Sequence, residues 1–355
     1  MEKLVIGVPA CNERATIAPL ADALEFGSAL LGECVLCELV LAYQAGEDDT
    51  LRQWESRSFR LANRVLHCEP GLTGKGRNVK LLIRHAHETG AHLLLVDADL
   101  SSYPPSHVVE FARPERLARG GAVLPLWCRP RGEGNSSDFL AAPLLFAAYG
   151  ARIRQPLAGQ MLLTRRVLDT IDVDGLPDDY GIDVGLTMHV LDQGLPVDQV
   201  VVAFPDHEGG ANGHRIMTSV ASTMLSGLAS NTSWANGRRD RRDVSWPFGW
   251  WRGQSEPPPS ERSLRPLIEG LVPSEQPGRW TALFEAPPDV VREMWCERLG
   301  AAVGQARAGY PIPDVVAELV HPFLIHAEYR RQVAPDRDGA ETYVADLCDR
   351  LAATV

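Results

Sequence analysis

Two carboxylates separated by one residue, Asp97 and Asp99, directly follow the apolar run Leu93–Val96. Four apolar residues in a row predict a buried parallel strand. Ligands of open α/β sheets bind beyond the carboxyl ends of the strands, and alternate strand residues point the same way. Both carboxylates can therefore face one bound cation and a diphosphate. The negative charge of a diphosphate must be neutralised when a glycosidic bond to that diphosphate breaks. A solvated loop is the alternative for an isolated Asp-x-Asp.

A glycine-rich turn at residues 71–78 places Lys75 between Gly74 and Gly76, just before a predicted helix. Glycines permit close backbone approach, a helix N-terminus favours an anion, and the lysine adds a point charge. The spacing is not that of a Walker loop. We expect a diphosphate or its sugar at Lys75, with a flexible basic turn as the alternative.

Two more side chains that could take part in chemistry follow later in the chain. Asp183 lies near the start of a predicted helix over 181–194. His207 follows a predicted strand over 198–204 and precedes two glycines. A histidine there is a credible ligand of a divalent ion together with Asp99. A surface-loop histidine is the alternative, and His214 is the second choice of ligand.

The ends of the first two predicted strands also carry polar residues. Pro9, Asn12 and Glu13 end the first strand and can present backbone and amide groups to a base or ribose. Simple N-capping by Asn12 is the alternative. Asp48 and Asp49 follow the second strand, where a carboxylate could accept hydrogen bonds from a nucleobase or ribose.

The elements that must position these groups alternate as in a nucleotide-binding α/β domain. Strands are expected at 3–10, 37–44, 64–69, 92–100, 120–127, 160–168 and 198–204. Helices are expected at 13–30, 48–62, 76–90, 137–153 (amphipathic) and 181–194. We expect this domain to cover residues 1–232, followed by a proline- and charge-rich excursion over 233–263. Helical periodicity over 264–355, including 312–332 and 339–355, predicts a helical C-terminal subdomain.

Composition narrows the class of protein. A length of 355 residues fits one large domain with an appendage. The net charge of −11 argues against nucleic acid as the main partner. No run approaches a membrane span or a secretory signal, so we expect a cytoplasmic protein without a membrane partner. Its helical C-terminus favours a homodimer.

The seven cysteines are an odd, scattered set and do not predict a disulfide framework. Cys34 and Cys37 form a lone C-x-x-C in an apolar run. We expect both to be buried thiols on a strand or its approach.

Taken in order, the motifs VPACNE, TGKG, VDADL, QPLAGQ and YGIDVG, with His207, resemble the GT-A-fold retaining glycosyltransferases that make glycosylglycerates. The nearest patterns are those of the glucosyl-3-phosphoglycerate and mannosylglycerate synthases. The resemblance spans roughly residues 5–225. It implies a GT-A fold, a Rossmann-like nucleotide-diphospho-sugar transferase domain, with the helical C-terminal subdomain appended.

The resemblance also implies which residues bind the donor, a nucleoside-diphosphate sugar of the UDP-glucose or GDP-mannose type. Lys75 would meet the diphosphate, and Asp183 would address the sugar. The implied donor-binding residues are Pro9, Ala10, Glu13, Asp48, Lys75, Asp97, Leu157, Ala158 and Gly159.

Metal and acceptor sites are implied in the same way. Asp99 and His207 would hold Mg or Mn, and Asn135, Ser136 and Ser137 would bind the acceptor. The loop at Asn135 lacks the arginine that the phosphoglycerate synthases place beside their acceptor, which weakens the case for a phosphorylated acceptor. Compensation by Arg129, Arg131 or the basic segment 237–242 is the alternative.

Three further positions depart from the family pattern. Ser137 replaces threonine, Gln160 replaces glutamate, and Asp183 stands where one relative has glutamate.

We expect a metal-dependent glycosyltransferase that moves a hexose to a small hydroxy acid such as glycerate or 3-phosphoglycerate, with retention. Lys75 and the cation would stabilise charge on the diphosphate, and Asp183 would orient sugar hydroxyls. One alternative is an inverting GT-A enzyme on another acceptor, with Asp183 as general base. The other is a non-catalytic nucleotide-sugar-binding protein.

Overall fold

The computed structural model describes residues 1–69, 71–130, 133–206, 213–230, 286–333 and 337–354. Contacts divide the chain into two compact units. The first comprises Met1–Trp127 and Ala158–Ala211, and the second comprises Cys128–Leu157 and Asn212–Val355. The C-terminal helices therefore pack with residues 128–157 from the first half of the chain. The excursion expected over 233–263 lies outside the described residues.

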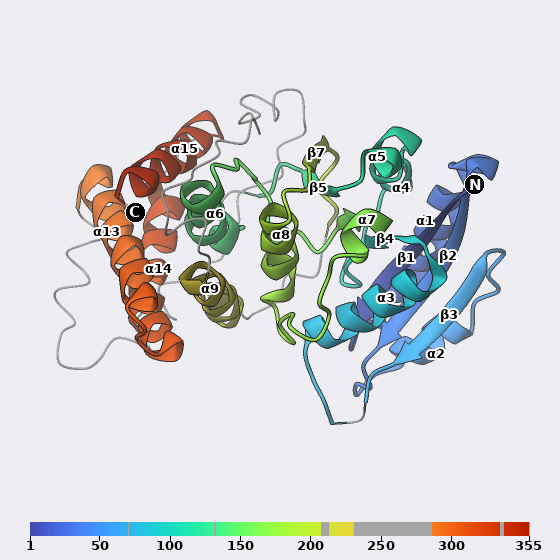
Figure 1. The fold of residues 1–355 in the computed structure, drawn as a ribbon. Coiled ribbons are helices and arrows are strands. Elements are labelled where there is room, and N and C mark those ends of the chain that lie inside the picture. The colour runs from blue at the N-terminus through green and yellow to red at the C-terminus, as the bar shows by residue number, and fades with distance from the viewer. Residues whose placement is uncertain (70, 131–132, 207–212, 231–285, 334–336, 355) are drawn as a thin grey trace. The chain divides into compact units, whose positions relative to one another are not determined.

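The first unit contains a seven-stranded sheet with the order β3-β2-β1-β4-β6-β5-β7 (Figure 1). The strands are β1 (Glu2–Ala10), β2 (Val35–Tyr43), β3 (Ala62–His67), β4 (His92–Leu95), β5 (Ala122–Leu126), β6 (Met161–Leu163) and β7 (Val197–Val201). Strand β6 runs antiparallel to β4 and β5, and the other pairings are parallel. Ala10 pairs with Tyr43, so β1 and β2 end at the same level.

Strand β1 is buried on both faces, which is the reason for its continuous apolar sequence. Leu4 and Ile6 belong to one hydrophobic core with Leu20 of α1 (Ile17–Ala29). On the other face, a Cβ added to Gly7 would lie 2.9 Å from Leu82 of α3 (Lys75–Thr89). Glycine at this position therefore allows α3 to pack closely on the sheet.

Helices cover both faces of this sheet. The remaining ones are η1 (Gly32–Cys34), α2 (Thr50–Glu55), α4 (Ser106–Phe111), α5 (Pro114–Arg119), α7 (Arg165–Leu168) and α8 (Ile182–Asp192). Helix α1 contacts α2 and α4, whereas α3 contacts β1, β2, β4, α7 and α8. Helix α3 ends at Thr89, and the following Gly90, with a φ of 65°, caps its carboxyl end.

One predicted helix is much shorter in the structure. The helix expected over 48–62 forms only as α2. The Glu25 carboxylate accepts hydrogen bonds from the backbone N–H groups of Arg60 (2.5 Å) and Leu61 (3.1 Å). These bonds hold the following segment in a non-helical path into β3.

The second unit is helical in its described part. It contains η2 (Ser137–Ala141, a π-helical turn), α6 (Ala142–Tyr149), α9 (Gly213–Ser230), α13 (Pro288–Arg307), α14 (Ile312–Val333) and α15 (Arg337–Thr354). The amphipathic helix expected over 137–153 is instead η2 followed by a short α6. Nearly all of its residues are buried because α15 packs on both η2 and α6, and α9 packs on η2.

A buried ionic network lies inside the second unit. Arg154, only 1% exposed, donates two 2.8 Å hydrogen bonds to Glu341 and another to Asp138. Arg330 donates a 2.6 Å hydrogen bond to the other oxygen of Asp138. Burial alone would raise the pKa of Asp138, but the charges of the two arginines lower it.

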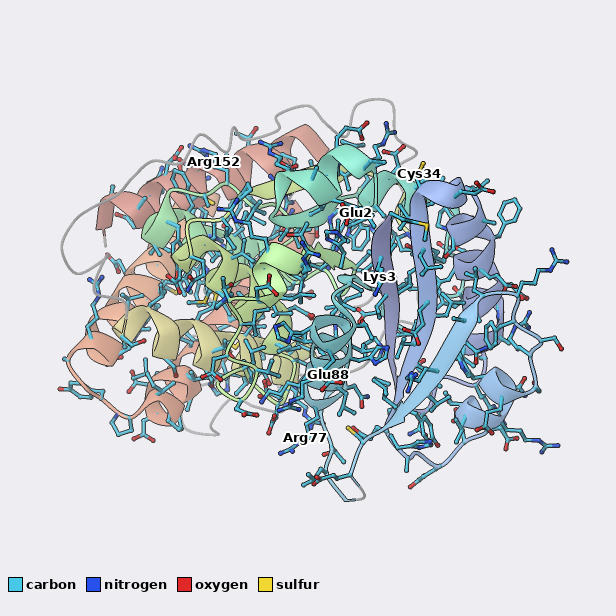
Figure 2. The ribbon with its side chains drawn as sticks, turned by 45° about the vertical axis from the view of Figure 1, so that its right-hand side comes forward. Glu2, Lys3, Cys34, Arg77, Glu88 and Arg152 are labelled. Atoms are coloured by element: carbon cyan, nitrogen blue, oxygen red, sulfur yellow. The ribbon has the colours of Figure 1, made fainter. Side chains whose placement is uncertain are left out.

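All seven cysteines are free. Cys37 is buried on β2, as expected. The expectation that Cys34 is buried is wrong: this residue ends the exposed turn η1, before β2 enters the core (Figure 2). Within the described ranges, no helix is both long and apolar enough to cross a membrane.

Candidate functional site

Three predicted site residues meet at the carboxyl edge of the sheet. Lys75 is the first residue of α3, Asp97 follows β4, and Asp183 is the second residue of α8. Lys75 Nζ lies 2.8 Å from Asp97 Oδ1 and 2.8 Å from Asp183 Oδ2. One ammonium group therefore joins two carboxylates, and the side chain of one of them, Asp97, stays 31% exposed.

The charges of this trio are strongly coupled. Burial alone would lower the pKa of Lys75, but the charges of Asp183 and Asp97 raise it. Burial raises the pKa of Asp183 to about 6, and the charge of Asp97 adds to this effect, although Lys75 acts in the opposite direction. At neutral pH Lys75 is protonated, while Asp183 can gain or lose its proton near physiological pH.

Gly159 makes room for Asp97. A Cβ added to this glycine would lie 1.6 Å from Asp97 Oδ2, so no other residue fits without moving the carboxylate. Ala158, beside it, is buried. The predicted donor-binding residue Gly159 therefore lies against Asp97, and Ala158 is its buried neighbour in the chain.

The predicted metal ligands are only partly within the described residues. Asp99 lies two residues beyond Asp97 and is partly buried, whereas His207 lies outside the described residues. Asp206 is described: its carbonyl accepts a 2.8 Å hydrogen bond from Ser101 N, and its carboxylate accepts a 3.0 Å bond from Ser102 Oγ. In the described part of the chain, no cluster of three His, Cys, Asp or Glu residues could hold a metal ion. His214, the second choice of ligand, is the second residue of α9.

The loops after β1 and β2 are tied to each other. Asn12, with a φ of 61°, accepts a 2.7 Å hydrogen bond on Oδ1 from Glu47 N. Asp48 accepts a 3.0 Å bond from Arg14 N, and Glu13 N donates a 2.6 Å bond to Thr50 Oγ1. N-capping by Asn12 is therefore not its role, because α1 begins only at residue 17.

Asp48 is ionised in this arrangement. Burial alone would raise the pKa of Asp48, but hydrogen bonds from Thr50 and from the Arg14 backbone lower it. The carboxylate predicted to lie near the base therefore also holds the two loops together. The β1 end is linked to α3 as well, since Ala10 O accepts a 3.4 Å bond from Asn78.

Two residues of this edge escaped the sequence analysis. Gln44 follows β2, and its Oε1 accepts a 3.0 Å hydrogen bond from Gly74 N, the residue before Lys75. Asp178 binds Arg77 and Lys80 on α3. The available signals were the polar residue directly after a buried strand and the acidic pair that precedes Asp183.

The family departure at Gln160 has a local explanation. Gln160 is buried, and its Nε2 lies 2.5 Å from Tyr103 Oη and 3.5 Å from His107 Nδ1. Burial lowers the pKa of His107 to about 4, so the imidazole is neutral. A neutral amide suits these neutral partners, whereas a carboxylate at this position would be a buried charge without a cation.

The predicted acceptor residues Asn135, Ser136 and Ser137, like Leu157, belong to the second unit. Ser137 starts η2 and is 1% exposed. Its Oγ has no hydrogen-bond partner among the described residues. Buried hydroxyls are usually hydrogen bonded, so Ser137 retains a free capacity to bind a polar group.

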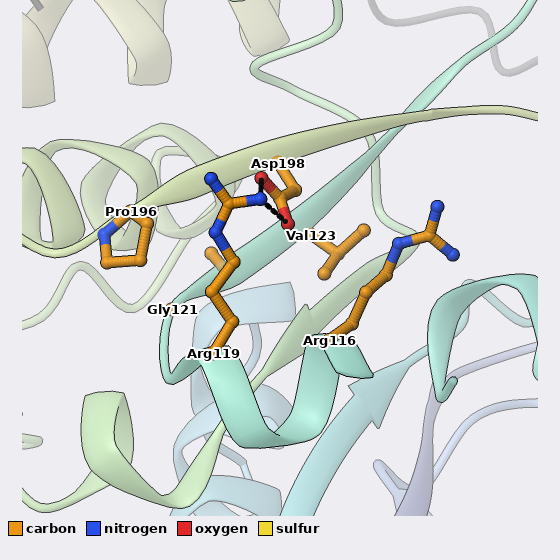
Figure 3. A pocket seen from close by; sticks show the side chains of 7 residues that line it. Arg116, Arg119, Gly121, Val123, Pro196 and Asp198 are labelled. Carbon is orange, nitrogen blue, oxygen red and sulfur yellow. Dashed lines mark hydrogen bonds and ion pairs between the residues drawn. The ribbon is translucent and has the colours of Figure 1, made fainter. Parts of the chain in front are cut away.

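A surface hollow elsewhere in the first unit does not provide a competing site (Figure 3). It lies where β5 and β7 begin, at the edge opposite the carboxyl end of β4. Arg119 Nη1 lies 2.8 Å from Asp198 Oδ1, and Arg116 pairs with Glu110. Both arginines that line the hollow are thus already neutralised by carboxylates.

Comparison with solved structures reveals the same architecture in an enzyme. The chain is similar to glucosyl-3-phosphoglycerate synthase from Mycobacterium tuberculosis in complex with Mn²⁺, uridine diphosphate and phosphoglyceric acid. The TM-score is 0.52, with 24% sequence identity over 63% of this chain and 78% of that chain. The chain has the fold of this synthase. The predicted GT-A fold with a helical C-terminal region is thereby confirmed.

Two other structures of the synthase agree. The complex with Mg²⁺ and uridine diphosphate gives a TM-score of 0.52 at 23% identity, covering 63% of this chain and 79% of that chain. A further structure of the synthase gives 0.51 at 22% identity, covering 63% and 80%. No family model and no curated protein matches the chain.

Proposed function

We propose that the protein is a metal-dependent glycosyltransferase that moves a hexose from a nucleoside-diphosphate sugar to a small hydroxy-acid acceptor. The observation that carries this proposal is the trio in which Lys75 joins Asp97 and Asp183 at the carboxyl edge of the sheet. The fold adds support, because the similar synthase has been solved with Mn²⁺, uridine diphosphate and phosphoglyceric acid.

Lys75 would hold the diphosphate of the donor. Its side chain is only 15% exposed, so its charge acts in a medium that screens less than water. A diphosphate that approaches the ammonium replaces part of its interaction with Asp97 or Asp183. As the bond to the sugar breaks, charge grows on the leaving diphosphate, and a fixed cation stabilises that charge without reorganisation.

The residues present fit a hard divalent cation. Carboxylate oxygens suit Mg²⁺ and Mn²⁺, and Mg²⁺ is commonly held by one or two carboxylates together with substrate phosphates. We propose Asp99 and His207 as the ligands, with Asp97 on the nucleotide side. The hydrogen bonds of Asp206 to Ser101 and Ser102 support this pairing, since they hold the residue before His207 close to the Asp-x-Asp segment. When bound, the cation would neutralise charge on the diphosphate.

The donor would be of the UDP-glucose or GDP-mannose type. We propose Pro9, Ala10, Glu13 and Asp48 beside the base, on the loops that the Asp48 hydrogen bonds join. The sugar would be addressed by Leu157, Ala158, Gly159 and Asp183.

The acceptor would be of the glycerate or 3-phosphoglycerate type, bound by Asn135, Ser136 and Ser137. The buried hydroxyl of Ser137 supports this assignment, because it can pair with a hydroxyl or carboxylate of the acceptor.

We propose transfer with retention. The leaving phosphate oxygen would take the acceptor proton, and Asp183 would orient the hydroxyls of the sugar. A second candidate is inversion with Asp183 as general base, because a pKa of about 6 suits a base that acts near neutral pH. The anomeric configuration of the product, read from proton NMR couplings, separates the two.

The proposal is tested by measuring hydrolysis and transfer with UDP-glucose and GDP-mannose, with Mg²⁺ or Mn²⁺, against glycerate and 3-phosphoglycerate. Metal-dependent transfer to either acceptor is expected. Donor hydrolysis alone would retain the glycosyltransferase and redirect the search to other acceptors. Tight, metal-dependent donor binding without either reaction would favour a non-catalytic binding protein. A homodimer and a cytoplasmic location stay predictions.

A further inference from the structure

Asp178 joins the segment before α8 to the first turns of α3. Its Oδ2 lies 2.6 Å from Arg77 Nη2, and its Oδ1 lies 2.7 Å from Lys80 Nζ. Arg77 and Lys80 are three residues apart, so their side chains lie on one face of the helix. Figure 2 shows Arg77 at the amino-terminal end of α3. One carboxylate thus bridges two cations next to the candidate site.

The backbone of the same segment lies directly on the start of α3. A Cβ added to Gly74 would lie 2.2 Å from the carbonyl oxygen of Asp178. A Cβ added to Gly76 would lie 2.2 Å from the carbonyl oxygen of Pro177. The two glycines of the TGKG motif therefore allow close approach of residues 177–178 to the helix start.

Lys75 lies between these glycines, and Asp183 lies five residues after Asp178. The Lys75–Asp183 ion pair, at 2.8 Å, and the Asp178 bridge therefore connect the same two segments. The chain between Asp178 and Asp183 is short, so movement of Asp178 is passed on to Asp183. Loosening of the bridge would therefore leave the position of Asp183 relative to Lys75 less restricted.

Folding stability explains only part of the Asp178 bridge. The side chains of Asp178 and Arg77 are 42% and 32% exposed, and ion pairs exposed to this extent contribute little to folding. Lys80 is only 10% exposed, so its pairing with Asp178 also stabilises the fold. A hydrogen bond from Lys80, opposed by partial burial, and the charges of Lys80 and Arg77 lower the pKa of Asp178. The Asp178 carboxyl is therefore ionised at neutral pH.

We propose that Asp178 is a positioning residue: it holds residues 177–181 on α3 and thereby sets the distance between Lys75 and Asp183. The inference rests on the proposed function only for its effect on turnover, because the geometry itself can be tested without donor or acceptor.

The chain offers an unusually clean chemical readout, since Lys3, Lys75 and Lys80 are its only lysines. An amine-acylating reagent is applied to the full-length protein, and the labelling rate of each lysine is followed by mass spectrometry. In Asp178→Asn, Lys80 loses its partner and should label several-fold faster than in the parent protein. The proposal requires that Lys75 also label several-fold faster, while the exposed Lys3 stays unchanged as the reference.

Asp174→Asn is the matched control. Asp174 pairs with Arg84 of α3 at 2.5 Å, but its side chain is 88% exposed and the pair lies farther along the helix. This variant should leave Lys75 labelling unchanged. Faster labelling of Lys80 alone, of neither lysine, or of Lys75 in both variants would overturn the proposal.

Turnover supplies the second test. Asp178→Asn should lower kcat by about tenfold or more, since misplacement of about 1 Å at a site can cost about 100-fold. The KM of the acceptor should change little, and Asp178→Glu should restore part of kcat. The thermal midpoint should fall, because Lys80 is only 10% exposed and loses its partner. If the parent protein is active and Asp178→Asn has the same kcat, the positioning role is overturned. A parent protein without transfer would overturn the proposed function and leave the labelling result readable.

Discussion

Lys75 Nζ lies 2.8 Å from Asp183 Oδ2, although the two residues are 108 positions apart in the chain. The same ammonium lies 2.8 Å from Asp97 Oδ1. The charges of the two carboxylates raise the pKa of Lys75, and Lys75 in turn opposes the rise in the pKa of Asp183. Predictions about this trio therefore concern activity and protonation together.

Replacement of Lys75 tests the role of its charge. In Lys75→Met, kcat for sugar transfer should fall by about 100-fold or more, as for loss of one preorganised electrostatic contact. The protein should still fold, because Asp183 can take up a proton once its cation is gone. Lys3→Met is the control, since Lys3 donates only an exposed 3.2 Å hydrogen bond to Thr89 O. Equal kcat in the two variants, measured beside circular dichroism, would refute the assignment.

The pH dependence of activity should report Asp183. Its pKa is raised from 3.8 to about 6, chiefly by burial, and the carboxylate form is needed to bind sugar hydroxyls or a proton. We expect kcat/KM to fall as the pH drops through about 6. Asp183→Asn should have low activity without this acid limb. A parent profile that is flat between about pH 5 and 7 would contradict the prediction.

The pH dependence of stability that Asp183 causes is opposite to that of activity: stability falls, rather than rises, as the pH increases. The folded state binds this proton more tightly than the unfolded state. The contribution therefore favours folding below about pH 4 and is lost as the pH rises through about 6. Asp183→Asn should remove this dependence, which urea denaturation at several pH values would measure.

Metal dependence should reside in Asp99 and His207. Asp99→Ala and His207→Ala should abolish metal-dependent turnover while the protein stays folded, because each removes one of the two proposed ligands of the cation. His214→Ala is the matched control, since this exposed histidine at the start of α9 is the other ligand that the sequence offered. Metal-dependent turnover that survives in both Asp99→Ala and His207→Ala would refute the proposed ligands.

Gly159 should tolerate no side chain. In Gly159→Ala, the new Cβ would overlap Asp97 Oδ2, so the carboxylate must move away from its position beside Lys75. We expect a large loss of kcat/KM for the donor. Gly304→Ala in α13 is the control, because a Cβ there meets nothing within 4 Å and alanine favours a helix. Full activity of Gly159→Ala would show that the placement of Asp97 beside this glycine is wrong.

The buried network of the second unit should dominate its stability. Glu341→Gln leaves the buried charge of Arg154 undercompensated and should lower the free energy of unfolding by about 3–5 kcal/mol. Asp349→Asn breaks an ion pair with Arg152 whose acidic side chain is 58% exposed, so its effect should stay below about 1 kcal/mol. Urea denaturation compares the two, and equal effects would contradict the prediction.

Much of the fold could be predicted from the sequence because its signals are local. The apolar runs of β1, β2 and β4 and the cap at Gly90 depend on neighbouring residues only. The same is true of Asp97, Lys75 and Asp183, which short sequence motifs place at the ends of a strand and two helices. Helix α2 and the exposed Cys34 were mispredicted because a tertiary contact, from Glu25, and a turn before β2 decided them.

The sequence by itself determined the class of fold, the ends of strands where polar groups collect, and the three residues of the ionic trio. Only the tertiary structure decided that one lysine joins both carboxylates and that Gly159 leaves space for Asp97. It also decided that Asp178 bridges two cations of α3. Periodicity and propensity act over a few residues, whereas these contacts join distant segments that meet because α3 packs on β4 of the sheet and on α8.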